Sequence, residues 1–556
     1  MLWRPAPPLV PPFAPLRLRL APHRPTPCRL TSPAWRKSLS LSSHPAFRPL
    51  IQSTSRLFAA VDTHPLSLAR RSYQPPYTVC KPLLLHTPRR LSTMVAEDFE
   101  AVLKGKYPGK AHAKRVVQML REKGAATDGI LYLEGRHTKM IEDNDGPEPF
   151  RQRRFFYYLT GCNLPDCYFL YDIQADKSTL FIPPIDPEDV VWSGLPTTID
   201  EALKLYDVDD VKPTTEVASV LAQISAANPK STVYAIANQV SDHISLDSFA
   251  AKDLTALKST IETARVVKDE YEVALIRKAN YISGLGHIAA MKRAKTAKTE
   301  QELEASFLER CYSHNAKEMA YHPIFGSGRA AATLHYIDNT RSLEGKQNVL
   351  VDAGAEWNNY SADITRTFPI SGTFTKESRE IYEIALKMKN ETSSRLKGGV
   401  NYDELHILAH TIAIDGLLAL GILKGDKNEI LAARTSAAFF PHGLGHHLGM
   451  DTHDTGGGQN RQDPDKLFPN LRLRGTVPAG SVVTIEPGIY FCEFIIKPYL
   501  KDPVHSKFID EAVLNKYWDV GGVRIEDDIL VTETGSENLT NLPTAAADIE
   551  AFVASA

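Results

Sequence analysis

Two aspartates flank a short polar turn between two strand-like runs in the second half of the chain. If the turn is the two-residue loop Trp357-Asn358, Asp352 lies directly opposite Asp363, with Cβ atoms about 5 Å apart. Carboxylates this close repel unless a cation lies between them, one stays protonated, or Arg366 neutralises one. A bound divalent cation is the simplest explanation, and a register that separates the two acids is the alternative.

Four histidines occur within twelve residues of a glycine-rich segment: His442, His446, His447 and His453. The interspersed glycines make a regular helix unfavourable, so these imidazoles are expected to project from a tight loop that can approach a ligand closely. A single histidine is more often a structural residue. Four of them beside Asp451 and Asp454 favour a metal or catalytic site.

Two further carboxylates stand at the ends of apolar strand-like runs. Glu486 follows Val482 to Ile485 and precedes a Pro-Gly breaker, which places it at a rim. Glu526 alternates with valines and isoleucines and shares its predicted face with Arg524. Taken singly, each run could be an ordinary half-exposed strand.

The four segments together supply two aspartates, at least one histidine and two glutamates. A ligand set of mostly carboxylate oxygens with little imidazole is typical of a paired-metal hydrolase that binds Mn²⁺, Co²⁺ or Zn²⁺. It is not typical of a structural zinc site, which is rich in cysteine. The residue chemistry alone therefore predicts a carboxylate-rich metal centre.

The elements that position this centre form the second of two predicted domains. Residues 94–264 alternate short strands, such as 129–134, 167–171 and 178–182, with helical stretches, which predicts an α/β domain. A long helix begins just after 265 and opens the domain 265–556. That domain alternates helices at about 299–316, 375–396 and 401–421 with strand-rich blocks at 347–370, 479–495 and 520–533.

Residues 1–93 differ in composition from the rest of the chain. They hold 14 Lys and Arg against one acid, Asp62, and 17 of the 37 prolines, so they carry +13 and the remainder −15 of the net −2. We expect this segment to be disordered or removed. It resembles a mitochondrial transit peptide apart from its prolines, whereas a start near Met94 predicts a cytoplasmic protein.

The remaining composition excludes several classes of protein. No apolar run is long enough to span a membrane, and the acidic folded part disfavours binding to nucleic acid. Cys162 and Cys167 have no second cysteine pair or nearby histidine to complete a zinc site, so reduced structural thiols in a reducing compartment are expected.

The motifs resemble those of the aminopeptidase P and prolidase family of proline-specific metallopeptidases. The resemblance rests on Asp352 followed by Asp363-Ile-Thr-Arg-Thr-Phe-Pro, on His442-Gly-Leu-Gly-His446, on Thr484-Ile-Glu-Pro-Gly and on Arg524-Ile-Glu-Asp-Asp. It implies an α+β fold in which a C-terminal pita-bread (creatinase/aminopeptidase-like) catalytic domain follows a smaller α/β N-terminal domain. The stretch from Phe150 to Trp192 is similar to that N-terminal domain.

The resemblance also implies roles for particular residues. The metal ligands would be Asp352, Asp363, His446, Glu486 and Glu526, holding two divalent ions, expected to be Mn²⁺, with Asp363 and Glu526 bridging both. Glu486 would act as general base, His335 and His453 would stabilise the oxyanion, Arg524 would be a further catalytic residue, and His442 and Arg472 would bind the substrate. No role is assigned to His447.

The implied reaction is hydrolysis of the peptide bond before a proline in second position, by a homodimer. Cleavage of longer peptides and dipeptides, as by aminopeptidase P, is preferred here to strict dipeptide cleavage, as by prolidase. Arg472 falls where prolidase-like enzymes bind a dipeptide carboxylate, but Arg474 is an equal candidate. The distant alternative is a pita-bread protein that has lost its metals and only binds partners, and methionine aminopeptidases fit the N-terminal domain poorly.

Overall fold

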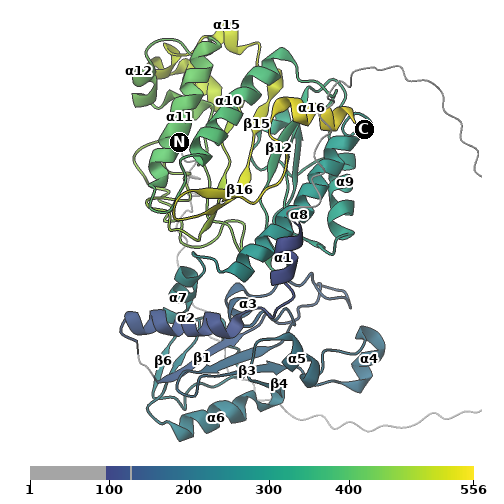
Figure 1. The fold of residues 1–556 in the computed structure, drawn as a ribbon, viewed down its shortest axis with the longest axis vertical. Coiled ribbons are helices and arrows are strands. Elements are labelled where there is room, and N and C mark those ends of the chain that lie inside the picture. The colour runs from purple at the N-terminus through teal and green to yellow at the C-terminus, as the bar shows by residue number, and fades with distance from the viewer. Residues whose placement is uncertain (1–95, 126–127, 556) are drawn as a thin grey trace, which may run out of the picture. The chain divides into compact units, whose positions relative to one another are not determined.

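The computed structural model describes residues 96–125 and 128–555 (Figure 1). The expected leader, 1–93, lies outside these residues. None of the helices in the described part is long and apolar enough to cross a membrane. The four cysteines of this part, Cys162, Cys167, Cys311 and Cys492, are free thiols, as expected.

A six-stranded mixed sheet organises the first half of the described chain. Its order is β4-β3-β2-β1-β5-β6, with β1 antiparallel to β2 and parallel to β5. The strands are β1 Gly129–Glu134, β2 Tyr168–Asp172, β3 Lys177–Ile182, β4 Asp210–Pro213, β5 Thr232–Tyr234 and β6 Ala251–Asp253. The first three match the predicted runs within a residue, which confirms the α/β character of this region.

Both faces of this sheet are covered, because alternate side chains of β1 enter different cores. Ile130 and Tyr132 pack with Leu221 of α6, whereas Leu131 and Leu133 pack with residues of α2, α3 and α7. In Figure 1, α6 lies on one side of the sheet and α2 on the other. The helices of this region are α1 Ala96–Val102, α2 Gly109–Glu122, α3 Arg154–Thr160, α4 Pro187–Ser193, α5 Ile199–Leu205, α6 Val217–Ala227 and α7 Ala256–Ala264.

A 24-residue helix, α8 Glu270–Arg293, opens the second half as predicted. Its start is fixed by a capping box, in which the side chain of Asp269 accepts from the backbone N–H of Glu272 and the side chain of Glu272 accepts from that of Asp269. Lys292 and Arg293 in the last turn complement the helix dipole.

The remaining helices surround small sheets. The predicted helical blocks correspond to α9 Glu300–Tyr312, α10 Lys376–Ser393 and α11 Tyr402–Ala419. The others are α12 Lys427–Ala432, α13 Glu493–Lys501, α14 Pro503–Ser506, α15 Glu511–Leu514 and α16 Ala546–Ala554, with 3₁₀ turns at Thr214–Glu216, Gly328–Ala332, Thr435–Ala438 and Trp518–Val520. The strand-rich block predicted to reach 495 ends at Tyr490, because Glu493 already begins α13.

The strands of the second half form separate two- and three-stranded sheets, in the orders β11-β10-β7, β12-β9-β8, β13-β16-β17 and β14-β15. They are β7 Glu318–Met319, β8 Ile324–Ser327, β9 Asn348–Asp352, β10 Ala355–Trp357, β11 Tyr360–Ser361, β12 Thr365–Pro369, β13 Val482–Ile485, β14 Gly488–Tyr490, β15 Gly522–Arg524, β16 Asp527–Val531 and β17 Ser536–Asn538.

The predicted hairpin register is wrong by two residues. Trp357 pairs with Tyr360 and Asp352 with Thr365, so the turn is Asn358-Asn359 rather than Trp357-Asn358. Both asparagines have positive φ, 47° and 64°, as a two-residue loop of type I′ requires and asparagine tolerates. Asp363 therefore lies two residues before the partner of Asp352 rather than directly opposite it.

Candidate metal centre and substrate cavity

All ten predicted site residues line one cavity of about 800 Å³. These residues are His335, Asp352, Asp363, His442, His446, His453, Arg472, Glu486, Arg524 and Glu526. The fold thus gathers side chains that are up to 191 positions apart in the sequence, from His335 to Glu526, around one space.

Strand ends bring the four acids together. Ile485, the last residue of β13, pairs with Asp527, the first residue of the antiparallel strand β16. Glu486 directly follows β13 and Glu526 directly precedes β16, so the two glutamates lie at the same edge of this sheet. A bridge between Thr365 and Glu526 joins this edge to β12, next to which Asp363 lies. The predicted placement of the carboxylates at strand ends is therefore correct.

The histidine loop is irregular, as predicted, and two of its glycines, Gly443 and Gly445, line the cavity. A Cβ added to Gly445 would lie 2.1 Å from the carbonyl oxygen of Thr484. Glycine at this position therefore also allows the loop to approach strand β13 closely. The backbone N–H of Thr484 donates to the carbonyl of His446 at 2.9 Å, which fixes the imidazole against the strand that ends in Glu486.

His446 is close to two of the acids. Its Nε2 lies 3.3 Å from Oδ2 of Asp363 and 3.6 Å from Oε1 of Glu486. Asp363, His446 and Glu526 each offer a ligand atom, and these atoms lie within 4.8 Å of one another. This is a spacing that a metal ion can bridge.

The charges in the cavity do not balance. Burial raises the pKa of Glu486 to about 7, and Asp363 and Asp352 add to this effect by repulsion. Burial and the neighbouring acids raise the pKa of Glu526 well above its ordinary value. Although burial opposes it, the bond to Asp363 raises the pKa of His446 to about 9. Raised pKa values show that these neighbouring acids repel one another when ionised. A bound cation would remove this repulsion, so the cluster is suited to binding cations.

Arg524 neutralises one of the two hairpin aspartates. Its Nη2 contacts Oδ2 of Asp352, and the hydroxyl of Tyr321 donates to Oδ1 of the same carboxylate at 2.6 Å. Arg366, the residue considered from the sequence, pairs with Asp527 instead. Sequence reasoning missed Tyr321, because an isolated tyrosine in a loop carries no distinctive signal.

A hydrogen-bonded chain runs from Arg524 to His442. Arg524 Nη1 donates to the hydroxyl of Tyr490 at 2.7 Å, and that hydroxyl donates to Nε2 of His442 at 2.7 Å. His442 Nδ1 in turn donates to the carbonyl of Gly443 at 2.8 Å, which assigns the neutral tautomer. Burial lowers the pKa of His442 to about 3, in agreement with this assignment.

The remaining predicted histidines differ in their surroundings. The ring of His453 lies 4.5 Å from that of His446, edge to face, and burial lowers its pKa to about 2. His335 lines the cavity. His447, to which no role was assigned, is buried, and its Nδ1 has no hydrogen-bond partner among the described residues.

The structure separates the two candidate arginines. Arg472 lines the cavity. Arg474 does not, because it pairs with Asp403 at 3.0 Å and with Asp463 at 2.9 Å. Arg472 is therefore the one that can meet a substrate.

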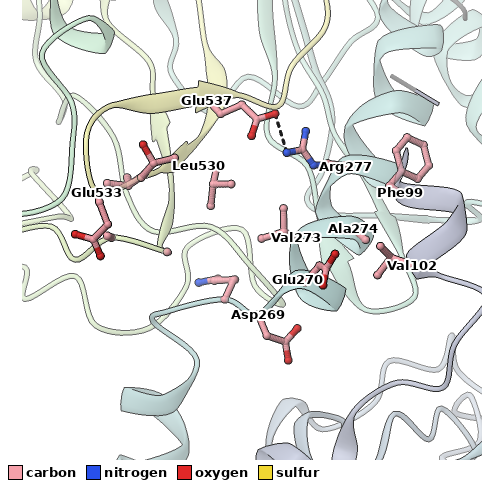
Figure 2. Close-up of a pocket in the computed structure, with 15 residues that line it drawn as sticks. Phe99, Val102, Asp269, Glu270, Val273, Ala274, Arg277, Leu530, Glu533 and Glu537 are labelled. Carbon is pink, nitrogen blue, oxygen red and sulfur yellow. Dashed lines mark hydrogen bonds and ion pairs between the residues drawn. The ribbon is translucent and has the colours of Figure 1, made fainter. Parts of the chain in front are cut away.

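A second cavity, of about 760 Å³, lies at the beginning of α8 and includes none of the predicted residues (Figure 2). Arg277 and Glu537 form an ion pair of 2.7 Å on its rim.

Nearby, His112, Asp269 and Glu272 form another group with metal-ligand spacing. His112 Nδ1 bonds the carbonyl of Tyr158 and Nε2 bonds Asp269, both at 2.7 Å, so both ring nitrogens are already used.

A buried histidine behind the site makes the fold sensitive to acid. The Nε2 of His287 donates to the carbonyl of Ala353, and burial lowers its pKa to about 4. Between pH 6.5 and 4 the unfolded chain binds a proton at this position and the folded chain does not, so stability falls as the pH falls. His287→Gln should therefore reduce the loss of unfolding free energy between pH 7 and pH 5 by about 2 kcal/mol.

Urea unfolding of the chelator-treated protein at the two pH values measures this effect. His243→Gln, which removes an exposed histidine, serves as the control for the loss of an imidazole. Equal acid sensitivity in the His287 variant and the unchanged protein would show that the imidazole is protonated in the folded state.

Comparison with known proteins assigns the family. Residues 274–533 match the model of metallopeptidase family M24, and residues 112–234 match the aminopeptidase P N-terminal domain. A probable Xaa-Pro aminopeptidase of Fusarium vanettenii is 69% identical over 460 residues, covering 83% of this chain and all of the relative. One from Metarhizium acridum is 68% identical, covering 83% of this chain and 92% of the relative. The chain therefore belongs to metallopeptidase family M24.

Solved structures define the branch of the family more closely. Aminopeptidase PepP of Pseudomonas aeruginosa is 28% identical with a TM-score of 0.68, covering 81% of this chain and 99% of that one. Proline aminopeptidase P II of Yersinia pestis is 30% identical with a TM-score of 0.67, covering 80% and 100%. The expected pita-bread catalytic domain and smaller N-terminal domain are thereby confirmed.

Proposed function

We propose that this chain is a dinuclear-metal Xaa-Pro aminopeptidase, which releases the N-terminal residue of peptides with proline in second position, dipeptides included. The observation that supports this most strongly is the joint presence of five ligand-type residues and the other five predicted residues in one cavity of an M24 fold. The names of the relatives agree with it.

The proposed ligands are Asp352, Asp363, His446, Glu486 and Glu526, with Asp363 and Glu526 shared between two divalent ions. The donor set fits, because the four carboxylates gather in one cavity, where Asp363 and Glu526 are buried, Asp352 pairs with Arg524 and Asp363 lies beside His446. When bound, such ions polarise the scissile carbonyl and activate water at neutral pH. We propose Mn²⁺ on the oxygen-rich ligand set, and the solved zinc-substituted Escherichia coli aminopeptidase P indicates that zinc can replace the native metal in a relative.

The protein's own groups provide the proton transfers. Glu486 is the proposed general base, which would accept a proton from water and pass it to the leaving nitrogen. His335 and His453 are the proposed donors to the oxyanion. The lowered pKa of His453 keeps its ring neutral, so it donates a hydrogen bond without carrying charge.

Proline specificity has a chemical basis. A bond before proline is a tertiary amide without an N–H, which peptidases that pair with a substrate backbone bind poorly. A solved E. coli aminopeptidase P contains the inhibitor Pro-Leu, a peptide that begins with proline. This supports a proline on the carboxyl side of the cleaved bond.

We expect the protein to release alanine from both Ala-Pro-Ala-Ala and Ala-Pro in the presence of Mn²⁺, with the tetrapeptide cleaved at least as well. The cavity, at about 800 Å³, is large enough for a short peptide. Chromatography of the released alanine measures both rates. Cleavage of Ala-Pro alone would replace this proposal by the strict dipeptidase, and cleavage of neither would favour the binding protein without metals.

We further propose a homodimer. Val191, Trp192 and Leu195 are 80%, 85% and 69% exposed, and such a run of exposed apolar side chains is typical of an interaction surface. Light scattering of the purified protein distinguishes a dimer from a monomer.

The cellular location also remains a proposal. We propose a cytoplasmic protein when translation starts near Met94, and a mitochondrial one when residues 1–93 act as a transit peptide. Sequencing the N-terminus of the native protein, together with cell fractionation, decides between them.

A further inference from the structure

The segment between His453 and β13 carries an excess of unpaired positive charge at the cavity. It holds six charged residues from 455 to 475: Arg461, Asp463, Asp465, Lys466, Arg472 and Arg474. Each of its two acids is already engaged. Asp463 pairs with Arg474 at 2.9 Å, and Asp465 pairs with Arg434 at 2.6 Å.

Arg461 and Arg472 both line the cavity, and neither guanidinium has an ion pair or hydrogen bond within the described residues. Arg472 is half-buried and Arg461 is exposed, so the two mark an inner and an outer position. Burial lowers the pKa of Arg472, and repulsion from Arg461 adds to the effect even though Glu486 opposes it. Two neighbouring guanidinium groups that form no ion pair within the described residues can bind an anion.

The backbone around Arg461 is held in place. The side chain of Gln459 donates to the carbonyl of Pro469 at 3.0 Å, and Gly458 forms a bridge with Leu473. Asn460 accepts from the backbone N–H groups of Gln462 and Asp463. The loop that carries Arg461 is therefore held by its own hydrogen bonds. This reduces the conformational entropy lost when the guanidinium binds a ligand.

The charge also orients a peptide in the cavity. A substrate carries an ammonium group at one end and a carboxylate at the other, and two adjacent arginines repel the ammonium and attract the carboxylate. The arginines therefore mark the side that receives the part of the substrate beyond proline. Arg472 was assigned above to the carboxylate of a dipeptide, which leaves the outer position without a role.

We propose that Arg461 is a specificity residue that binds the terminal carboxylate of peptides one residue longer than a dipeptide. The inference rests on the proposed Xaa-Pro aminopeptidase function. Its consequence is that the enzyme prefers short peptides with a free carboxylate to the same peptides with a blocked end.

The test compares Ala-Pro-Ala with its C-terminal amide. In the unchanged protein the free acid should be the better substrate, and Arg461→Gln should lower the ratio of kcat/KM for acid over amide about tenfold, mainly through KM. Arg461→Lys should retain part of the preference, because it keeps the charge but loses the forked geometry. The matched control Lys466→Gln removes an exposed cation of the same segment that does not line the cavity, and should leave the ratio unchanged.

An unchanged acid-to-amide ratio in Arg461→Gln, or the same fall in Lys466→Gln, would overturn the inference. Binding of the products separates it from the proposed function. Calorimetry with Pro-Ala and Pro-Ala amide should show an about tenfold weaker affinity for the acid in Arg461→Gln, even if the protein hydrolyses nothing. Absence of any hydrolysis with this binding change intact would reject the enzyme and keep the carboxylate site.

Discussion

Asp363→Asn is expected to reduce kcat/KM for Ala-Pro-Ala-Ala by at least about 10³-fold and to lower the metal content from two ions to at most one per chain. The reason is the position of this carboxylate. It lies 3.3 Å from His446 and within ligand-sharing distance of Glu526, and it is the proposed bridge between both ions. The amide removes a negative charge without changing the size of the side chain.

Metal analysis by mass spectrometry and the rate of alanine release measure the two effects in the same sample. Asp415→Asn, on the exposed side of α11, removes an equal charge outside the cavity lining and should change neither. Retention of two ions together with normal turnover in Asp363→Asn would exclude this residue from the centre.

Arg366→Ala is expected to lower the unfolding free energy by at least about 3 kcal/mol. The side chain is fully buried and pairs with Asp527 at 2.6 Å, and it donates to the backbone carbonyls of Thr365 and Glu526. Its removal leaves the buried carboxylate of Asp527 with Lys389 alone as a cationic partner and frees carbonyls that water cannot reach.

Urea unfolding followed by circular dichroism measures this loss. Arg379→Ala, whose guanidinium pairs with Glu550 at the surface of α10, is the matched control and should cost less than about 1 kcal/mol. An equally small loss of unfolding free energy in both variants would show that the buried pair of Arg366 and Asp527 does not stabilise the fold. Because Arg366 donates to the backbone carbonyl of Glu526, we also expect weaker metal binding in Arg366→Ala.

The placement of the acids could be predicted because it depends on local patterns. A run of apolar residues that ends in a carboxylate and a Pro-Gly breaker, as at Glu486, specifies a strand end without tertiary information. The spacing of the apolar residues after 265 likewise predicts the long helix α8. The grouping of these ends in one cavity was inferred through family resemblance, since no local rule fixes which strands pair.

The hairpin register could not be fixed from the apolar pattern. The pattern specifies the face of a strand, and a shift of two residues preserves the face, so it cannot distinguish neighbouring registers. The Asn358-Asn359 pair carried the missing signal, because asparagine tolerates the positive φ of such a turn. A two-residue turn at Asn358-Asn359 places Thr365 opposite Asp352.

Ion-pair partners were the least predictable part of the site. Arg366 is closer in sequence to both hairpin aspartates, yet Arg524 is the residue that contacts Asp352. Arg472 and Arg474 are two residues apart in the sequence. Arg474 is the one that pairs with acids, Asp403 of α11 and Asp463 of the 455–475 segment. Such choices depend on contacts between distant segments, which sequence spacing does not report.

The most direct test of the central claim is the release of alanine from Ala-Pro-Ala-Ala by protein stripped with a chelator, measured before and after Mn²⁺ is returned. We expect no release from the stripped protein and restored cleavage at the bond before proline once two ions are bound per chain. Mn²⁺ that binds without restoring release, or release that persists after complete removal of metal, would contradict it.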